Sequence, residues 1–300
     1  FTCNALYYDP IREEILDFHN GVNDIAARSL VMIGDAAERY REDPVRILRA
    51  VRLSGKLGFS VEESTAAPIP EYAGHLKHEP VARLFDEIMK LLFSGHAREC
   101  LKKLNSLGVS DDIHPLLTAL KSAEKAENRI ISLALKNTDE RLRQDKSVSV
   151  GFVLAAVLWP DVNRRWQQNL AQGQKPAPAL TDAIESLRSD VEKGWGVPQR
   201  FAATMREIWQ FQPQFEQMRG ARPHRLLAQQ RFRAAYDFLV LRGEVGEIDR
   251  QMVEWWNSFQ HADEDLRNEM TTNHARAQSN EGVKKKRRRR PRKKKTEQGQ

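Results

Sequence analysis

Residues 38–59 of the chain read ERYREDPVRILRAVRLSGKLGF. The pair Asp43-Pro44 predicts a helix start, with Asp as N-cap and Pro at the first helical position, where its missing N–H costs nothing. At 100° per residue, a cationic stripe then lies opposite an apolar stripe. The cationic stripe comprises Arg46, Arg49, Arg52 and Lys56, and the apolar stripe comprises Ile47, Leu48, Ala50 and Val51. We expect a helix that buries one face and presents cations on the other.

The cation row has two interpretations. On spacing alone, an ordinary solvated helix face is favoured, with Asp43 as a plain N-cap. However, a capping box would place Glu or Gln at the position of Arg46, and a cation so near a helix N-terminus is electrostatically unfavourable. Arg46 could therefore have another partner. A cation row beside the carboxylates of Glu42 and Asp43 suits a ligand with phosphates and a hydrogen-bonding base.

The rest of the chain is predicted to be mainly α. Short β-rich runs at 5–8 and 14–18 around Asp9-Pro10 predict a hairpin, followed by a short helix at 21–30 and a strand at 30–33. Glycine and proline stop signals then delimit a series of helices, with a linker at 171–179. These helices are expected at 62–77, 81–94, 96–107, 124–144, 151–159, 180–192, 198–211, 222–240 and 249–259.

A basic run near the C-terminus dominates the charge. Residues 284–295 read KKKRRRRPRKKK, with eleven cations and no acid; because the whole chain carries +7, the remainder carries −4. Each phosphate that such a run neutralises releases counterions, so nucleic acid is the favoured partner. An acidic membrane surface or a merely solubilising tail are the alternatives, but no amphipathic helix or lipid anchor adjoins the run. From about residue 278 the chain loses nearly all apolar residues, which predicts disorder.

Several classes of function lack their sequence signals. Two cysteines, Cys3 and Cys100, form no disulfide framework and indicate a reducing compartment, with Cys100 expected in a buried helix. The longest apolar run, 152–159, is too short to span a bilayer. There is no P-loop, G-x-G-x-x-G or G-x-S-x-G motif. His75 and His78 could form half a metal site, but surface histidines are the favoured interpretation.

Aromatic residues accompany arginines in the last third of the chain, in the stretch RFRAAY at 231–236 and at Trp255-Trp256. Aromatic side chains near arginine can stack on RNA bases. At helical spacing they more often form core, while the arginines extend outward. Core positions are expected for Tyr236, Phe238, Trp255 and Phe259. Arg231 and Arg233 remain open as RNA contacts.

Four segments together resemble the bacterial poly(A) polymerases, which share a nucleotidyltransferase superfamily with the CCA-adding enzymes. The segments are FTCNALYYD (1–9), GDAAERYREDPVRILRAVRLSGKLGF (34–59), EPVARLFDEIMKLLFSG (79–95) and RFRAAYDFLVLR (231–242). The first two are shared with CCA-adding enzymes, whereas the helical body and basic tail favour the polymerase branch. The resemblance implies a nucleotidyltransferase head remnant at 1–35, a helical neck for base recognition and RNA binding at 36–100, a helical RNA- or partner-binding body at 101–277 and a disordered Arg/Lys-rich tail at 278–300.

The family's catalytic elements are missing from this sequence. Its Gly-Ser loop, D-x-D pair and R-R-D element would precede Phe1, so the resemblance assigns no catalytic or metal-binding residue here. We expect a C-terminal fragment that is inactive alone, with Mg²⁺ held by the absent head domain. Cys3 stands where the family usually has a larger apolar residue.

The resemblance does assign nucleotide-binding residues. The family motif E-D-x-x-R matches Glu42, Asp43 and Arg46, and in the family its Asp and Arg hydrogen-bond the edge of the incoming base. Arg49 and Arg52 match the continuing R-x-x-R and would face the sugar-phosphate or the primer. Asn4 matches the Asn of F-T-x-N-A-L near the same nucleotide.

The implied function is that of a polynucleotide adenylyltransferase, which adds AMP from ATP to RNA 3′ ends without a template and marks RNA for decay. The implied setting is the cytoplasm, with RNA helicases or other decay proteins as further partners. The alternatives are a CCA-adding enzyme, or a non-catalytic helical RNA-binding module. Expected RNA contacts are Arg231, Arg233, Lys284, Lys285, Lys286, Arg287, Arg288, Arg289, Arg290, Arg292, Lys293, Lys294 and Lys295.

Overall fold

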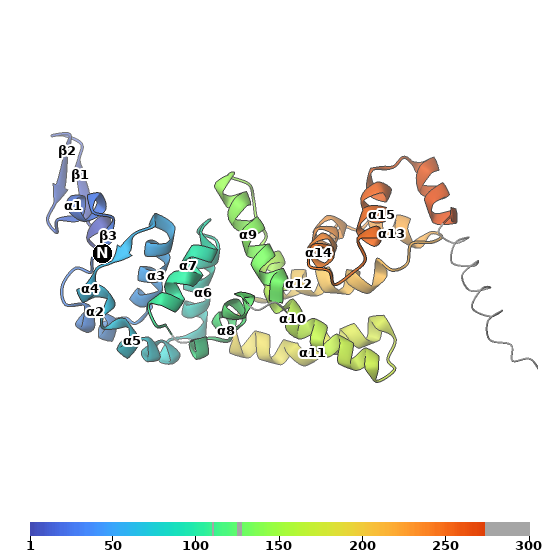
Figure 1. Cartoon of the computed structure of the whole chain (residues 1–300), viewed down its shortest axis with the longest axis horizontal. Coiled ribbons are helices and arrows are strands. Elements are labelled where there is room, and N and C mark those ends of the chain that lie inside the picture. The colour runs from blue at the N-terminus through green and yellow to red at the C-terminus, as the bar shows by residue number, and fades with distance from the viewer. Residues whose placement is uncertain (110, 125–127, 274–300) are drawn as a thin grey trace, which may run out of the picture. The chain divides into compact units, whose positions relative to one another are not determined.

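The structure is a computed structural model that describes residues 1–109, 111–124 and 128–273 (Figure 1). The described part is mainly helical with a few short strands, as the sequence predicts. Contacts divide the chain into two units, Phe1–Trp209 and Gln210–Gln300. The finer domain boundaries inferred from the sequence remain predictions, and the tail at 278–300 lies outside the described residues. None of the described helices is long and apolar enough to cross a membrane.

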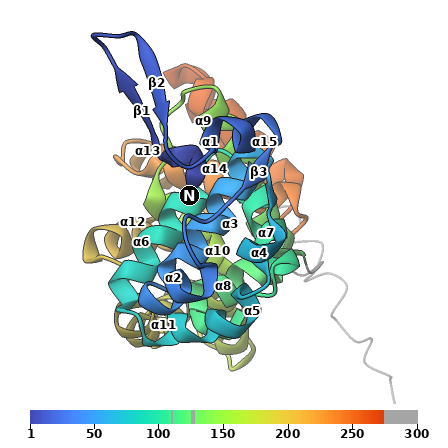
Figure 2. The ribbon, with the colours of Figure 1, turned by 90° about the vertical axis from the view of Figure 1, so that its left-hand side faces the viewer.

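The first unit begins with the predicted hairpin. After the 3₁₀ turn η1 (Thr2–Asn4), strands β1 (Leu6–Asp9) and β2 (Glu14–Asp17) pair antiparallel. The hairpin extends away from the helices that follow it (Figure 2). Helix α1 (Gly21–Ala26) leads to β3 (Ser29–Leu30), which is shorter than expected and pairs in parallel with β4 (Ser60–Val61). No local signal predicts β4, because two residues carry no alternation.

Seven helical segments contain or follow the arginine-rich stretch, which itself forms α2 and α3. They are α2 (Ala36–Glu42), α3 (Val45–Leu57), α4 (Glu63–Ala66), α5 (Ile69–Tyr72), η2 (Ala73–His78), α6 (Val81–Leu92) and α7 (Ala97–Ser106). The predicted apolar stripe of α3 is buried, and α3 packs against α6 and α7. Gly58, Gly95 and Gly108 adopt the left-handed conformation that ends helices. The single helix expected at 62–77 is instead three short segments. Pro68 and Pro70 separate α4 from α5, and after Tyr72 the chain continues as the 3₁₀ segment η2.

The remainder of the first unit is a stack of longer helices. Its elements are η3 (Asp111–Ile113), α8 (Pro115–Lys121), η4 (Ser122–Glu124), α9 (Arg129–Arg143), α10 (Val150–Ala171), α11 (Pro176–Gly194) and α12 (Gln199–Phe211). Helix α10 continues through Pro160, well beyond the expected end at 159, because the buried Trp159 and Trp166 hold both halves in the core. The linker expected at 171–179 shrinks to 172–175, since Pro176 occupies the permissive first turn of α11.

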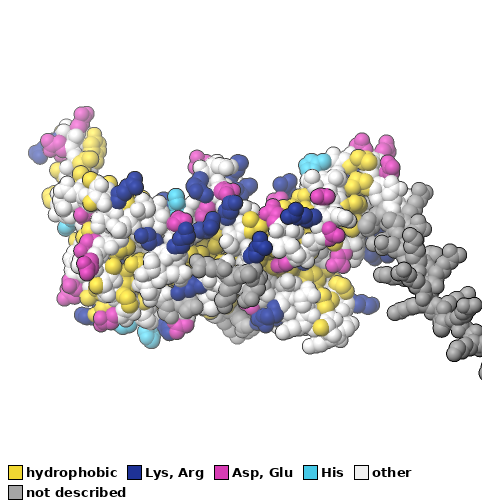
Figure 3. All heavy atoms as spheres, viewed as in Figure 1, with side chains coloured by type: hydrophobic (Ala, Val, Ile, Leu, Met, Phe, Trp, Pro, Cys, Tyr) yellow, Lys and Arg dark blue, Asp and Glu magenta, His cyan; other side chains and the backbone are white. Residues whose placement is uncertain are grey.

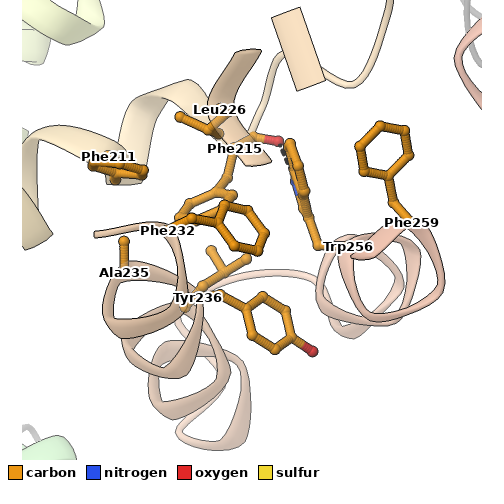
Figure 4. Packing of buried hydrophobic residues seen from close by; sticks show 9 residues of the cluster. Phe211, Phe215, Leu226, Phe232, Ala235, Tyr236, Trp256 and Phe259 are labelled. Atoms are coloured by element: carbon orange, nitrogen blue, oxygen red, sulfur yellow. Dashed lines mark hydrogen bonds between the residues drawn. The ribbon is translucent and has the colours of Figure 1, made fainter. Parts of the chain in front are cut away.

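The second unit is built around aromatic side chains. Its elements are η6 (Gln212–Gln214), α13 (Arg222–Leu227), α14 (Phe232–Glu244), α15 (Arg250–His261) and a helix at 264–273. Figure 4 shows Phe215, Phe232 and Trp256 converging, with the indole N–H of Trp256 donating to the carbonyl of Phe215 at 2.8 Å. The core positions expected for four aromatic residues are confirmed: Tyr236, Phe238 and Phe259 are buried, and Trp255 packs partly buried against this cluster.

The helix expected at 222–240 is broken at 228–231. Leu226 and Phe232 both enter the aromatic cluster. On one continuous helix, six residues apart, they would point roughly 120° from each other. The break turns the chain so that both side chains reach the same core, a requirement that local sequence signals do not carry.

Candidate functional site

The arginine-rich stretch forms two helices joined at Asp43. Helix α2 ends at Glu42, Asp43 is extended, and α3 begins at Val45, with Pro44 as its N-cap residue. The start lies one residue later than the sequence predicts. Nevertheless the Oδ1 atom of Asp43 accepts the N–H of Val45 at 3.2 Å, so Asp43 satisfies one of the unpaired donors at this helix start.

Arg46 has the additional partners that its position requires. Its Nη1 donates to the carbonyl oxygen of Arg39 at 2.7 Å and to Oε2 of Glu42 at 3.0 Å. Its Nε lies 4.0 Å from Oδ2 of Asp43, and its side chain is 21% exposed. The hydrogen bond from Arg46 holds the pKa of Glu42 below its usual value. Arg46 is therefore an oriented guanidinium that still reaches solvent.

Asp43 has a partner that the sequence did not suggest. Arg83 on α6 donates from Nη2 to Oδ1 of Asp43 at 2.8 Å, and from Nη1 to Glu79 at 2.6 Å. Forty residues separate Arg83 from Asp43, so only the folded chain brings them together. Since Val45 and Arg83 both use Oδ1, the contacts of Asp43 leave Oδ2 on the side of Arg46. Arg83 is the positioning residue that sequence reasoning missed, although it lies in the 79–95 segment.

The next two arginines of α3 are also constrained. Nε of Arg49 lies 3.4 Å from Oε1 of Glu87 on α6, which also accepts from Lys90 at 2.9 Å. The Glu87 side chain is 5% exposed, so this carboxylate is nearly buried. The Nε atom of Arg52 is buried and has no hydrogen-bond partner among the described residues. The stripe therefore differs from a plain solvated face, where arginines would extend into water.

Asn4 lies on the short turn that packs beside α3. Phe1 and Cys3 contact the cluster containing Ala50 and Phe59, which brings this turn to α3. Asn4 itself is exposed. Within the described part of the chain, no hydrogen bond joins it to Asp43 or Arg46.

The other expected RNA contacts belong to the second unit or to the tail. Arg231 is exposed just before α14, and Arg233 is exposed with its Nε 3.0 Å from a carboxylate oxygen of Asp237. The cations at 284–295 lie outside the described residues. The two units are each defined internally, so these arginines and the α3 arginines are separate candidates.

Candidate metal ligands are dispersed. His75 and His78 are exposed on η2, which confirms the interpretation as surface histidines, and His75 contacts the Tyr72 ring. Cys100 is fully buried in α7, as expected. Across residues 1–109, 111–124 and 128–273, no group of three or more His, Cys, Asp or Glu side chains is placed to hold a metal ion. No described residue is therefore assigned to Mg²⁺.

Two family models match the chain. Residues 58–121 match the probable RNA and SrmB-binding site of polymerase A, and residues 172–294 match the polymerase A arginine-rich C-terminus. The first begins within the arginine-rich stretch. The second covers the second unit as far as residue 294, which includes all of the basic run except Lys295.

Curated relatives extend the match to most of the chain. Poly(A) polymerase I of Escherichia coli O6:H1 is 37% identical over 267 residues, covering 87% of this chain and 57% of the relative. Poly(A) polymerase I of Haemophilus influenzae is 33% identical, covering 90% and 61%. The CCA-adding enzyme of Bacillus cytotoxicus is 38% identical, but over 104 residues and 35% of this chain. The chain spans about three fifths of the length of the two polymerases.

Solved structures agree in fold. A tRNA-processing enzyme with CTP superimposes with a TM-score of 0.56 and 17% identity, covering 90% of this chain and 74% of that one. The Bacillus stearothermophilus CCA-adding enzyme in complex with CTP gives 0.53 and 20% identity, covering 86% and 56%. At these identities the likeness shows a shared fold.

Proposed function

Because the chain belongs to the poly(A) polymerase family, we propose that it serves the template-independent addition of AMP from ATP to RNA 3′ ends. Within that polynucleotide adenylyltransferase, this chain supplies selection of the ATP base and grip on the RNA. The observation that carries the proposal is the pair Asp43 and Arg46, which lie side by side and are each fixed by other partners.

The pair has the polarity that adenine requires. Oδ2 of Asp43 can accept a hydrogen bond from the exocyclic amino group, while the Arg46 guanidinium donates to a ring nitrogen. Glu42 and the Arg39 carbonyl use Nη1 of Arg46, which leaves Nη2 without a partner among the described residues. Fixed donors and acceptors lose little freedom on binding, so the pair can discriminate between bases.

Arg49, Arg52 and Asn4 complete the proposed nucleotide site. Arg52 is half-buried and lies one turn after Arg49 on the same side of α3, which supports its place beside the sugar-phosphate or the primer. Arg49 is 41% exposed and can meet a phosphate while Glu87 holds its Nε. The packing of η1 beside α3 supports the inclusion of Asn4.

The metal chemistry belongs to other residues of the enzyme. Bound Mg²⁺ would activate the RNA 3′-hydroxyl and stabilise the pyrophosphate leaving group. In this proposal, this chain's part is to hold and orient ATP and RNA. Activity is expected only when the family's metal-binding carboxylates are present together with this chain.

The same proposal extends to the binding partners, the cellular role and the RNA contacts of the enzyme. The match at 58–121 to a probable RNA and SrmB-binding site supports RNA binding by this region, and an RNA helicase or another decay protein is the further partner that we propose. Poly(A) made in this way would mark RNA for decay, in the cytoplasm. Arg231, Arg233 and the cations at 284–295 would hold the RNA strand through its phosphates.

The decisive experiment measures nucleotide incorporation by the full-length protein. Asp43→Ala and Arg46→Ala should each lower kcat/KM for ATP and the preference for ATP over other nucleotides. The expected loss corresponds to about 1–3 kcal/mol of transition-state stabilisation, the discrimination typical of a good bidentate base contact. Asp43→Asn is the matched control for capping, since its side-chain oxygen can still accept from Val45. Unchanged kinetics in the Ala variants would return Asp43 and Arg46 to structural roles.

A CCA-adding activity is the second candidate, favoured by the match to the Bacillus cytotoxicus enzyme. It predicts incorporation of CMP as well as AMP and a preference for tRNA. The same assay with CTP separates the two, because CMP incorporation would contradict the polymerase proposal. If the full-length protein incorporates no nucleotide, the chain is a non-catalytic RNA-binding module.

Removal of the basic run tests the proposed RNA grip. Deletion of residues 284–295 should weaken RNA binding and flatten its dependence on salt, by about 0.7 in the log–log slope for each phosphate that is no longer neutralised. Binding titrations between 50 and 200 mM salt measure this, with RNA of one fixed length. An unchanged slope would show that the run does not contact RNA.

A further inference from the structure

A polar hollow lies beside η6 and α13 in the second unit. Its volume is about 280 Å³. It is lined by Gln214, Gln217, Arg222, Arg225, Leu226 and Gln229. The lining thus combines two guanidinium groups, three primary amides and one apolar side chain, and it contains no carboxylate.

The two arginines are available to a ligand. Arg222 and Arg225 are exposed and three residues apart on α13, which places them on one side of that helix. Neither forms an ion pair with another described residue, and Nε of Arg225 makes only a long hydrogen bond of 3.5 Å to the Ala221 carbonyl. Two guanidinium groups without a carboxylate in the lining favour an anionic ligand, phosphate in particular.

The glutamines add hydrogen-bonding groups of both kinds. Each primary amide offers a donor and an acceptor side by side, which complements the paired donor and acceptor on the edge of adenine. Nε2 of Gln214 donates to the Gln210 carbonyl at 2.9 Å, which orients its Oε1 as an acceptor. Gln217 and Gln229 are exposed at the rim.

The floor of the hollow is fixed by the core. Leu226 is 4% exposed and belongs to the aromatic cluster of Phe215 and Trp256 (Figure 4). A floor anchored in this way needs little rearrangement on binding. The volume lies just under the roughly 300–1,000 Å³ of small-molecule sites, which suits one nucleotide unit of a strand.

We propose that this hollow is a subsite for one adenosine nucleotide of a single RNA strand, with Arg222 and Arg225 on the phosphate and the glutamine amides on the base edge. The inference rests on the proposed function for its choice of RNA as ligand. It adds a specific contact in the second unit to the charge-based grip of Arg231, Arg233 and the basic run.

Photocrosslinking tests the subsite directly in the full 300-residue chain. The probe is an oligoadenylate of about 15 nucleotides, within the site sizes of single-strand binders, that carries one photoreactive adenosine. Crosslinked peptides are identified by mass spectrometry, and we expect crosslinks within 214–229. Arg222→Ala combined with Arg225→Ala should abolish them and lower the salt slope of binding by about 0.7, the value for the one phosphate that the two arginines neutralise. Arg200→Ala combined with Arg250→Ala removes two exposed cations that do not line the hollow, so this charge-matched control should retain them.

Base preference and ligand class are tested with the same probe. Gln217→Ala combined with Gln229→Ala should reduce crosslinking of the adenosine probe while leaving the salt slope unchanged. Absence of crosslinks in 214–229, equal crosslinking of an oligouridylate probe, or displacement by polyglutamate at equal charge would each overturn the proposal. Circular dichroism confirms that the variants are folded. The assay needs no AMP transfer, so a failure of the proposed polymerase activity is recognised separately by nucleotide incorporation.

Discussion

The arginines of α3 and those of α13 share a spacing but differ in what surrounds them. On α3, Arg46 and Arg49 contact the carboxylates of Glu42 and Glu87 (the latter from α6). On α13, Arg222 and Arg225 have no ion-pair partner among the described residues and share a hollow with glutamine amides. In Figure 3, Lys and Arg side chains lie among Asp and Glu side chains over parts of the visible face.

The difference separates two uses of arginine. A guanidinium held by carboxylates has a fixed direction, so its remaining N–H groups can be matched to one base edge. An exposed guanidinium without an acidic partner keeps its full charge available and binds phosphate in any sequence context. We infer that the α3 arginines contribute selectivity and that the α13 arginines contribute affinity, whereas base preference in the α13 hollow comes from the glutamine amides beside them.

Charge-preserving substitutions should have a large effect on activity at α3 and a small effect on RNA affinity at α13. Arg46→Lys replaces a fork of donors by one ammonium that cannot hold Glu42, the Arg39 carbonyl and a base together, so kcat/KM for AMP incorporation should fall on the order of 100-fold. Arg225→Lys preserves the charge, and RNA affinity should change by no more than roughly twofold. Both are measured in the full-length protein. Equal effects at the two sites would contradict the distinction between oriented arginines on α3 and arginines on α13 that act through their charge.

A tight helix crossing holds α3 in place. A Cβ atom added to Gly55 would lie 2.7 Å from both the Cα and Sγ of Cys100 on α7. Gly55→Ala should therefore lower the free energy of unfolding by about 1–3 kcal/mol, as expected for overpacking. Gly74→Ala, where no atom lies within 4 Å, is the matched control. Denaturant titrations measure both, and crosslinking in the α13 hollow should be unaffected.

Lowering the pH should reduce the free energy of unfolding of the first unit, because His114 is buried there. This side chain is 2% exposed, its Nδ1 accepts the N–H of Leu116 at 3.1 Å, and burial lowers its pKa to about 4. Between pH 6.5 and 4 the unfolded chain binds more protons than the folded one, so stability is lost as the pH falls. The expected loss between pH 7 and pH 5 is about 2 kcal/mol.

His114→Asn is the test of this loss. The Asn side chain still offers an acceptor to Leu116 but does not titrate, so the pH dependence of unfolding should be flatter. The second unit has no buried histidine among its described residues, and probes of its tryptophans should show a weaker dependence. An unchanged slope in the variant would assign the acid sensitivity to other groups.

Local signals predicted the elements that depend on short-range chemistry. The buried face of α3 follows from the helical periodicity of its apolar residues, and its C-terminal end follows from Gly58. The hairpin follows from its two β-rich runs. Where distant packing decided, prediction was wrong. Pro160 should have ended α10, but Trp159 and Trp166 keep both halves buried.

By itself, the sequence determined the amphipathic arginine helix, the aromatic core and the basic run, because periodicity, composition and charge are local properties. Only the tertiary structure decided which arginines are constrained. Arg83 and Glu87 come from α6 to contact Asp43 and Arg49, and no sequence period relates positions about forty residues apart. The arginine stripe was ambiguous as a sequence because a solvated row and an oriented row share one spacing, and they differ only in the carboxylates that the fold brings to them.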